Sequence, residues 1–308
     1  MLNSLTGAIE SGLLYALMAL GVYITFRILD FPDLTVDGSF ATGGAVAAIL
    51  ITNGTPVALA VVAAFFAGGI AGAITGLLHT KGKINGLLSG ILMMIALYSI
   101  NLRIMGRPNI SILDTEPLFS SIDNIWVKLI VIAICVFLVK FLLDGFLRTD
   151  LGLSLRATGD NARMIRSFGA NTDTTKILGI SLSNGLVALS GALIAQQTGF
   201  ADISMGIGMI VIGLASVIIG EAIFGARTVF WATLAAVLGS IIYRIVVALA
   251  LRVEWLDASD LKLITAIIVI VALMVPTINR SIKQKSLAKR RSAELAAQAA
   301  APRMGGPR

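Results

Sequence analysis

The sequence predicts an all-α polytopic membrane protein with about nine (8–10) transmembrane helices arranged as two inverted repeats. The chain has 57% hydrophobic residues, 13% charged residues and a mean hydropathy of +0.92, whereas soluble domains average about 25% charged residues. Several apolar runs reach the roughly 20 residues that cross a bilayer as a helix. Basic residues gather in alternate connections, and one short polar motif recurs in both halves of the chain.

Nine apolar runs are predicted to be spans. They lie at about 5–27, 39–52, 57–78, 86–105, 125–143, 177–198, 207–224, 229–251 and 263–278. The second and seventh runs are short for a full crossing, so each is alternatively a half-helix or a re-entrant segment, and the count then changes.

The distribution of basic residues predicts the orientation of the spans. Connections that are rich in Lys and Arg mark the cytoplasmic side of a membrane protein. Arg27, 79–83, 148–176 and Arg227 then lie inside, and the connections at 53–54, 106–124, 199–206 and 252–262 lie outside. Nine crossings satisfy this alternation, with the N-terminus outside and the C-terminus in the cytoplasm.

The net charge of +7 comes from the C-terminal tail. Residues 280–308 hold eight basic residues and one acidic residue, and the remainder of the chain is balanced. We expect residues 281–308 to form a disordered basic tail beside anionic lipid. An RNA-binding tail is the weaker interpretation, because the tail lacks aromatic residues for stacking on bases.

A motif repeats at a spacing of 169 residues. Phe31-Pro32-Asp33-Leu34-Thr35-Val36 corresponds to Phe200-Ala201-Asp202-Ile203-Ser204-Met205. Five predicted crossings separate the copies, which places the first at the cytoplasmic side and the second outside. The pattern predicts inverted repeats at about 5–105 and 177–278, joined by a linking span at 125–143.

Inverted repeats with broken helices are typical of transport proteins, whose substrate path follows the repeat interface. The candidate path or gate residues are Phe31, Asp33, Thr35, Asp37, Phe200, Asp202 and Ser204. The alternative interpretation is that Asp33 and Asp202 are ordinary caps at helix ends. The two interpretations are compatible.

The polar segment 148–176 is expected to be a short cytoplasmic helix. Asp160 or Asn161 is a candidate cap and Gly169 a candidate end. A basic helix with apolar faces either lies on the membrane or docks into the groove of a partner. A loop that merely obeys the charge rule is the simpler alternative.

Three charged residues lie within or near predicted spans. These are Glu10, Glu221 and Arg244. Because charges in a membrane are costly and often functional, each has either a structural role or a functional one. Arg244 lies toward the outer end of its span, from which its side chain can reach the interface. Glu221 lies toward the inner end, near Arg227.

The sequence gives no support to an enzyme. Cys135 is the single cysteine and His79 the single histidine, so a cysteine cluster or a histidine metal site is not expected. No phosphate-binding G-x-x-x-x-G-K-[ST] loop or hydrolase motif is present. We therefore expect this chain to bind no metal and no cofactor of its own.

Two stretches resemble a known family. The run from Arg156 to Phe200 is similar to the signature of ABC importer permeases of the branched-chain amino acid and sugar class. The matching positions are Arg156, Ala157, Gly159, Asn161, Ile165, Gly169, Ala170 and Asn171. The stretch from Ala16 to Ala48 looks closer to a subgroup linked to aromatic amino acids such as tryptophan or tyrosine. The resemblance covers about residues 1–280, which we take as one permease domain.

The resemblance implies a permease subunit in the bacterial cytoplasmic (inner) membrane. It implies a homodimer with two ATPase subunits, which hold ATP and Mg²⁺, and an external substrate-binding protein. The ATPases would dock under segment 148–176. The residues implied in coupling are Arg156, Gly159, Asp160, Asn161, Arg163, Met164, Arg166 and Gly169.

The expected substrate is a small solute, most simply an amino acid and possibly an aromatic one. The alternatives are an ABC permease for a sugar or nucleoside, an ion-coupled secondary transporter, and a membrane scaffold that acts through its basic tail.

Overall fold

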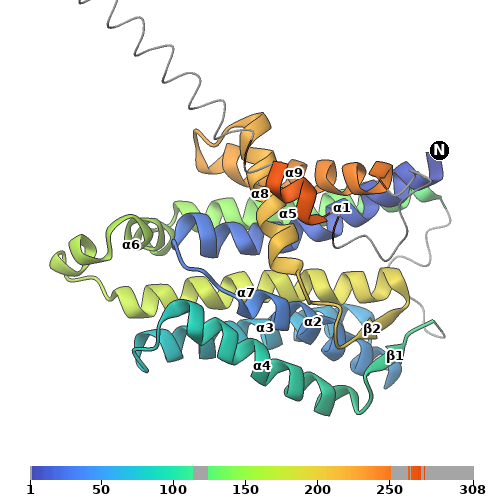
Figure 1. The fold of residues 1–308 in the computed structure, drawn as a ribbon, viewed down its shortest axis with the longest axis horizontal. Coiled ribbons are helices and arrows are strands. Elements are labelled where there is room, and N and C mark those ends of the chain that lie inside the picture. Colours follow the sequence, from blue (N-terminus) through green and yellow to red (C-terminus); the bar gives the residue numbers. More distant parts are fainter. Residues whose placement is uncertain (1, 114–123, 251–262, 264, 272–273, 275–308) are drawn as a thin grey trace, which may run out of the picture.

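A computed structural model of the 308-residue chain describes residues 2–113, 124–250, 263, 265–271 and 274. This part of the chain is almost entirely helical (Figure 1). Its elements are α1 (Leu2–Val22), a π-helical turn η1 (Tyr23–Ile28), α2 (Thr35–Thr52), α3 (Val57–Thr80), α4 (Gly86–Met105), β1 (Asn109–Ser111), α5 (Ile125–Arg148), α6 (Asp150–Ser167), α7 (Thr172–Thr198), β2 (Phe200–Asp202), α8 (Met209–Phe224) and α9 (Val229–Ala250).

The helices confirm a polytopic membrane protein. Among the described residues, seven helical segments are long and apolar enough to cross a bilayer, and α8 is a shorter apolar helix of 16 residues. The predicted link at 252–262, the basic tail at 281–308 and part of the ninth span at 263–278 lie outside the described residues. The count of nine therefore stays a prediction.

Two helices begin earlier than their apolar patterns indicate. Helix α2 starts at Thr35, where the Asp33 carboxylate accepts the backbone N–H of Thr35. Helix α7 starts at Thr172, and the Asn171 side chain accepts two backbone N–H groups in its first turn. Polar caps satisfy the free N–H groups of a first turn, so the helix begins at the cap and not at the first apolar residue.

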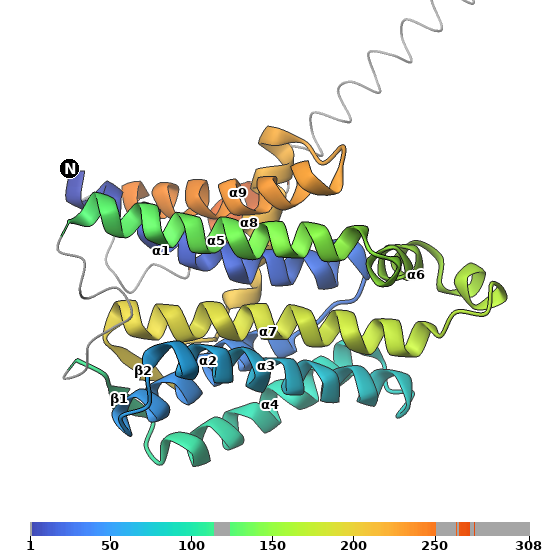
Figure 2. The same ribbon diagram turned by 180° about the vertical axis from the view of Figure 1, so that it is seen from behind.

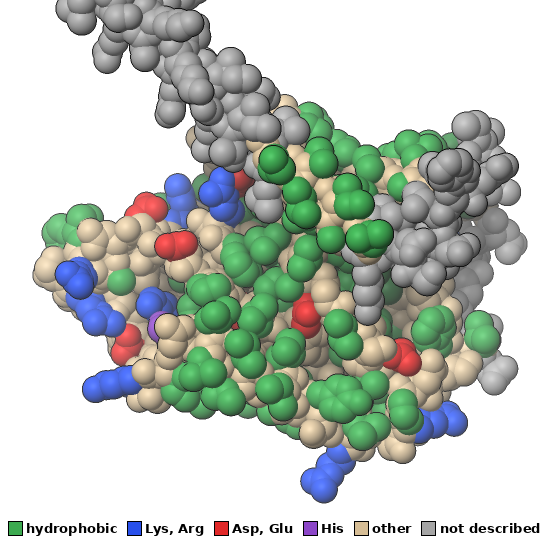
Figure 3. Space-filling model, viewed as in Figure 1, with side chains coloured by type: hydrophobic (Ala, Val, Ile, Leu, Met, Phe, Trp, Pro, Cys, Tyr) green, Lys and Arg blue, Asp and Glu red, His purple; other side chains and the backbone are tan. Residues whose placement is uncertain are grey.

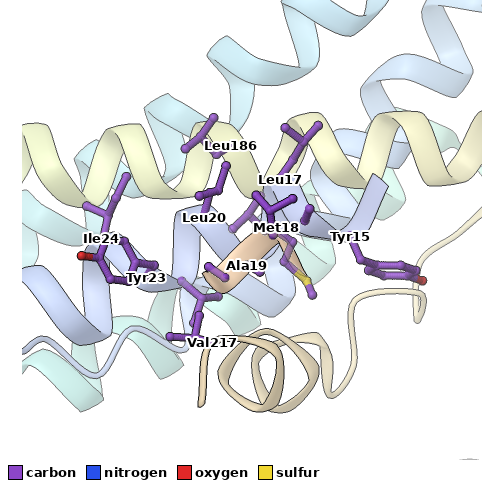
Figure 4. Packing of buried hydrophobic residues seen from close by; sticks show 14 of the residues in the cluster. Tyr15, Leu17, Met18, Ala19, Leu20, Tyr23, Ile24, Leu186 and Val217 are labelled. Atoms are coloured by element: carbon purple, nitrogen blue, oxygen red, sulfur yellow. The ribbon is translucent and has the colours of Figure 1, made fainter. Parts of the chain in front are cut away.

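Helices α1, α2 and α7 form the centre of the molecule. The apolar windows of these three segments are 83%, 72% and 72% buried, whereas those of α3, α4 and α5 are 28%, 28% and 22% buried. The exposed apolar faces of α3, α4 and α5 are therefore the natural lipid-facing surface. Aliphatic side chains of α1, including Leu17 and Leu20, pack toward Leu186 of α7 (Figure 4).

Small residues bring the central helices close together. A Cβ at Gly43 of α2 would lie 1.9 Å from the carbonyl oxygen of Ala188 in α7. A Cβ at Gly191 of α7 would lie 2.0 Å from the carbonyl oxygen of Phe40 in α2. Such backbone approach is how membrane helices gain packing without a hydrophobic driving force between them.

The connections separate into two groups at opposite ends of the bundle. At one end, β1 pairs antiparallel with β2, and the N-terminal part of α1 lies at this strand end (Figure 1). The other end carries α6, together with the contact between His79 and Lys176 (Figure 2). Figure 3 shows hydrophobic side chains across the middle of one face and Lys and Arg side chains toward both ends. This grouping agrees with the predicted alternation of connections.

The helices of the two halves correspond in order. Helix α1 precedes the first motif, and α2 and α3 follow it. In the same order, α7 precedes the second motif, and α8 and α9 follow it. Helix α5 lies between the two halves. Helix α1 runs from the strand end toward the α6 end, and α7 runs in the opposite direction (Figures 1 and 2). Opposite directions of corresponding helices are what an inverted repeat requires.

Candidate functional site

Asp33 lies deep inside the bundle. Its side chain is fully buried, its Oδ1 accepts the backbone N–H of Thr35 at 2.9 Å, and its Oδ2 accepts the Nδ2–H of Asn184 at 2.6 Å. Asn184 is near the middle of the 27-residue helix α7. The prediction that this copy of the motif faces the cytoplasm is wrong for Asp33, because the chain after η1 turns back into the bundle before α2 begins.

Asp202 is the counterpart of Asp33 at the strand end. Its Oδ1 accepts the backbone N–H of Ser204 at 2.7 Å, which is the same two-residue turn that Asp33 makes with Thr35. Asp202 is only partly buried, and its Oδ2 accepts a bond from Asn109 at 3.4 Å. The interpretation as a helix cap fits Asp33, since α2 begins at Thr35, but not Asp202, because the next helix begins only at Met209.

Asp37 joins the two halves of the molecule. It lies in the first turn of α2, and its carboxylate accepts the backbone N–H groups of Gly208 and Ile210, each at 2.8 Å. Those N–H groups belong to the start of α8. One carboxylate therefore lies between the N-termini of two helices, where the helix dipoles favour negative charge. We call this junction of α2 and α8 the crossing, defined by residues 33–39 and 206–210.

Glycine permits the close contact at the crossing. A Cβ at Gly206 would lie 1.9 Å from the carbonyl oxygen of Asp37. The segment that leads from β2 to α8 can therefore reach α2 only with a residue that has no side chain.

Three buried polar atoms in or beside the crossing have no hydrogen-bond partner among the described residues. These are Oγ of Ser39, Oδ1 of Asn184 and Oδ1 of Asn101, whose Nδ2–H donates to the carbonyl oxygen of Gly38 at 3.4 Å. Buried polar groups are normally paired, so unpaired ones indicate a site with a further role.

The structure places the predicted path residues in three regions. Asp33, Thr35 and Asp37 lie in or at the crossing, and the hydroxyls of Thr35 and Thr75 are 2.8 Å apart. Phe31 leads toward the α6 end, where its ring contacts His79 with centroids 5.0 Å apart. The remaining predicted residues, Phe200, Asp202 and Ser204, lie at the strand end.

Helix α6 projects from one end of the molecule as a kinked pair of helical segments. The break is at Asn161, which has non-helical φ and ψ, and whose Oδ1 accepts the backbone N–H of Met164 at 3.0 Å. Gly169 follows the second segment with a φ of +84°. Asn161 therefore caps the second segment, and Gly169 lies just beyond its end, as the sequence predicted.

The second segment of α6 presents an exposed apolar and basic surface. Met164 is 52% exposed, Phe168 is 77% exposed, and Arg163 is also exposed. Arg166 differs, because it donates to Thr172 at 2.6 Å and to Asp173 at 3.1 Å, which ties α6 to the start of α7. Arg163 thus belongs to the exposed surface, whereas Arg166, three residues later, holds α6 against the start of α7.

The first segment of α6 packs against the end of the first span. A Cβ at Gly159 would lie 1.7 Å from the carbonyl oxygen of Ile28 in η1. Arg156 and Asp160 line a cavity of about 290 Å³ together with residues of η1, α8 and α9. Of the predicted coupling residues, these three contact or face the transmembrane core.

Arg27 connects the two halves at the α6 end. Its Nε–H lies 2.9 Å from both carboxylate oxygens of Glu221 in α8, and its Nη2 also contacts that carboxylate. The sequence placed Glu221 near Arg227, and both line the same cavity, but the ion pair of Glu221 is with Arg27. The end of the first span is therefore tied to the end of α8.

Several functional candidates were missed in the sequence. Lys140 and Asp144 form a buried ion pair at 2.5 Å in α5, and Asp144 accepts the hydroxyl of Thr233 at 2.6 Å. Opposite charges four residues apart within an apolar run are a readable signal. The bonds from Gly208 and Ile210 to Asp37 had no such signal in the sequence, because both residues donate backbone N–H groups.

The sequence matches the protein family described as "Branched-chain amino acid transport system / permease component" over residues 4–275. The chain belongs to this family. The permease is 46% identical over 284 residues to a tyrosine transport system permease protein of Clostridioides difficile, covering 92% of this chain and 95% of that protein. It is 39% identical over 283 residues to an uncharacterised protein of Rickettsia prowazekii, covering 88% of this chain and 97% of that protein.

Sugar permeases are more distant relatives. The ribose import permease protein RbsC of Haemophilus influenzae is 26% identical over 202 residues, covering 62% of this chain and 60% of that protein. The chain is thus a multi-pass membrane protein and the permease subunit of an ABC importer. The tyrosine and ribose permeases among its relatives are transporter subunits by name. Among the described residues, no group of three His, Cys, Asp or Glu side chains is placed to hold a metal ion.

Proposed function

We propose that the permease imports an aromatic amino acid across the bacterial inner membrane. Two observations support this substrate: the 46% identity to a permease named for tyrosine transport, and its extension over 92% of the chain. The similarity to a ribose permease is both weaker and shorter. In this proposal the N-terminus lies outside and the α6 end faces the cytoplasm, in keeping with the basic residues of α6.

The observation that carries the mechanism is the bond of Asp37 to Gly208 and Ile210. It joins the first turn of α2, in the first repeat, to the start of α8, in the second, and transport folds place their substrate path at such a repeat interface. Alternating access then requires α2 and α8 to shift relative to each other, with the path passing the crossing. The permease acts as a homodimer, and an external binding protein delivers the substrate at the strand end.

Energy comes from two ATPase subunits that bind ATP and Mg²⁺ and dock on α6. A partner shifts a conformational equilibrium only through contacts that differ between the two states. The exposed Met164 and Phe168 are suited to such contacts. Gly159 transmits movement of α6 to η1, and the pair Arg27–Glu221 transmits it to α8.

The test is uptake of radiolabelled L-tyrosine by liposomes that contain the permease, its ATPase and its binding protein. We expect accumulation only with ATP inside and all three proteins present. Uptake of ribose in place of tyrosine would overturn the substrate. Accumulation driven by an ion gradient without the ATPase would overturn the ATP-driven mechanism.

A further inference from the structure

Arg244 is an intramembrane cation without a carboxylate partner among the described residues. Three other cations within candidate spans are paired: Arg27 with Glu221, Lys128 with Glu10, and Lys140 with Asp144. Arg244 lies in α9, forms no ion pair with a described carboxylate, and its buried Nε has no hydrogen-bond partner among the described residues. A charge in the bilayer is costly, so an unpaired one is a candidate for ligand binding.

The side chain of Arg244 turns into the bundle. Its guanidinium carbon Cζ lies 3.7 Å from the centroid of the Tyr15 ring, and Tyr15 of α1 is 6% exposed. The sequence-based expectation that Arg244 reaches the outer interface is therefore not what the structure shows. A cation–π contact offsets part of the cost of burying the charge, but it provides no acceptor for the buried Nε–H.

Aromatic rings lead from Arg244 to the crossing. Tyr15 stacks on Phe40 of α2, with ring centroids 5.9 Å apart and an interplanar angle of 4°. Phe40 is three residues after Asp37, which is nearly one helical turn. Figure 4 shows that the Tyr15 ring extends to one side of the aliphatic cluster that contains Met18 and Leu20.

Polar groups continue the same face of α1. Ser11 is one turn before Tyr15, and its hydroxyl donates to Oε1 of Gln197 in α7 at 3.3 Å. Helices α9, α1 and α2 thus bring together a guanidinium and two stacked rings, and an amide of α7 lies one turn further along α1. This combination matches the chemistry of an aromatic amino acid, which has a carboxylate at one end and a ring at the other.

We propose that Arg244 binds the carboxylate of the transported amino acid, and that Tyr15 and Phe40 contact its ring. In the absence of substrate, the Tyr15 ring occupies the face of the guanidinium. A carboxylate that enters the site can form a bidentate, charge-assisted contact with the N–H edge of the guanidinium, which the ring on its face leaves open. This assignment rests on the proposed function, since it requires a substrate that carries a carboxylate.

The test uses the full-length permease with its ATPase and binding protein in liposomes, and L-tyrosine as the probe. Arg244→Gln is expected to lower the maximal rate of tyrosine uptake roughly ten- to a hundredfold, the range for losing a hydrogen bond to a charged group. The external concentration for half-maximal uptake should stay unchanged, because the binding protein captures the substrate. ATP hydrolysed per tyrosine should rise, and Arg244→Lys should restore part of the rate.

Arg103→Gln is the matched control, because Arg103 is an exposed arginine in the last turn of α4. It should leave the rate and the ATP stoichiometry at their wild-type values. Absence of tyrosine uptake by the wild type would overturn the proposed substrate and, with it, this assignment. Wild-type uptake together with an unchanged rate in Arg244→Gln would overturn the assignment alone. Membrane insertion and basal ATP hydrolysis of each variant show whether a loss of uptake reflects misfolding. If Arg244→Gln misfolds, Arg244→Lys decides: partial uptake by the lysine variant supports the assignment, and no uptake by a correctly inserted lysine variant contradicts it.

Discussion

Asp37 of one repeat caps a helix of the other: its Oδ2 accepts the backbone N–H of Gly208 at 2.8 Å, just before α8 begins. The second oxygen accepts the N–H of Ile210 at the same distance. The negative charge of this carboxylate lies at the positive ends of two helix dipoles and therefore stabilises the contact between the two helix N-termini. Any change in the angle between α2 and α8 must stretch or release these two bonds, which makes the crossing the natural place for a conformational change.

The first prediction concerns Asp37. Asp37→Ala removes the acceptor of two N–H groups, and each buried group left unpaired costs about 1–3 kcal/mol. We expect a lower unfolding temperature of the purified permease and loss of most tyrosine uptake. Asp150→Ala is the control, because Asp150 lies exposed in the first turn of α6. Equal unfolding temperatures of the two variants would contradict the role of the cap.

The second prediction concerns the pair of Asp33 and Asn184. Asn184→Ala deprives the buried Oδ2 of Asp33 of the donor at 2.6 Å, so it should be strongly destabilising. Asp33→Ala should also destabilise the protein, because it removes the cap of α2. The double variant should cost less than the sum of the single variants, since neither partner is then left alone. Unfolding of the four proteins in detergent gives the coupling, and simple additivity would argue against a direct bond.

The positions of most helices were predictable from the sequence, because a long apolar run forms a helix whatever its distant neighbours are. The bounds of α4 (Gly86–Met105) were predicted at both ends, since an apolar run coincides there with the Asn85 cap and a glycine C-cap. The re-entry of the chain after η1 was not predicted. Nothing in the local pattern of 29–34 shows that Asp33 meets Asn184 some 151 positions away.

The site was predicted in part. The repeated motif predicted Asp33 and Thr35, with Asp37 directly after it, because interruptions at matched positions in two apolar runs are visible in a sequence. Gly208 and Ile210, the partners of Asp37, donate backbone N–H groups. Nearly every residue has such a group, so the sequence could not identify these partners. Arg244 was visible as a charge in a span, but its contact with Tyr15 depends on the packing of α1 against α9.

The third prediction concerns Gly159. A Cβ at this position meets the carbonyl oxygen of Ile28 at 1.7 Å, so Gly159→Ala must push α6 away from η1. We expect the variant to insert normally and to lose ATP-dependent uptake. Gly145→Ala in α5 is the control, because a Cβ there meets no atom within 4 Å. Wild-type uptake by Gly159→Ala would show that contact between α6 and η1 does not transmit movement.

The fourth prediction concerns the exposed surface of α6. Arg163→Glu reverses a charge on the segment that also exposes Met164, and we expect weaker co-purification of the ATPase and reduced uptake. Arg166→Glu should act more severely, because it also breaks the contacts with Thr172 and Asp173. Arg107→Glu reverses an exposed charge near the strand end and serves as the control. Unaltered uptake by a protein that carries both Arg163→Glu and Arg166→Glu would end the coupling role.

The most direct test of the central claim asks whether solute passes the crossing. Ser39→Cys, in a background in which the single cysteine Cys135 is changed to serine, puts a thiol at a buried position whose hydroxyl has no partner among the described residues. Ser190→Cys is the control, because Ser190 is equally buried but bonds to Leu14 between α1 and α7. The measurement is the rate at which a small, charged thiol reagent labels each protein, with and without ATP turnover. A path through the crossing predicts that turnover accelerates labelling at 39 but not at 190, and that excess tyrosine slows it. If 39 stays as unreactive as 190 while tyrosine uptake proceeds, the path lies elsewhere.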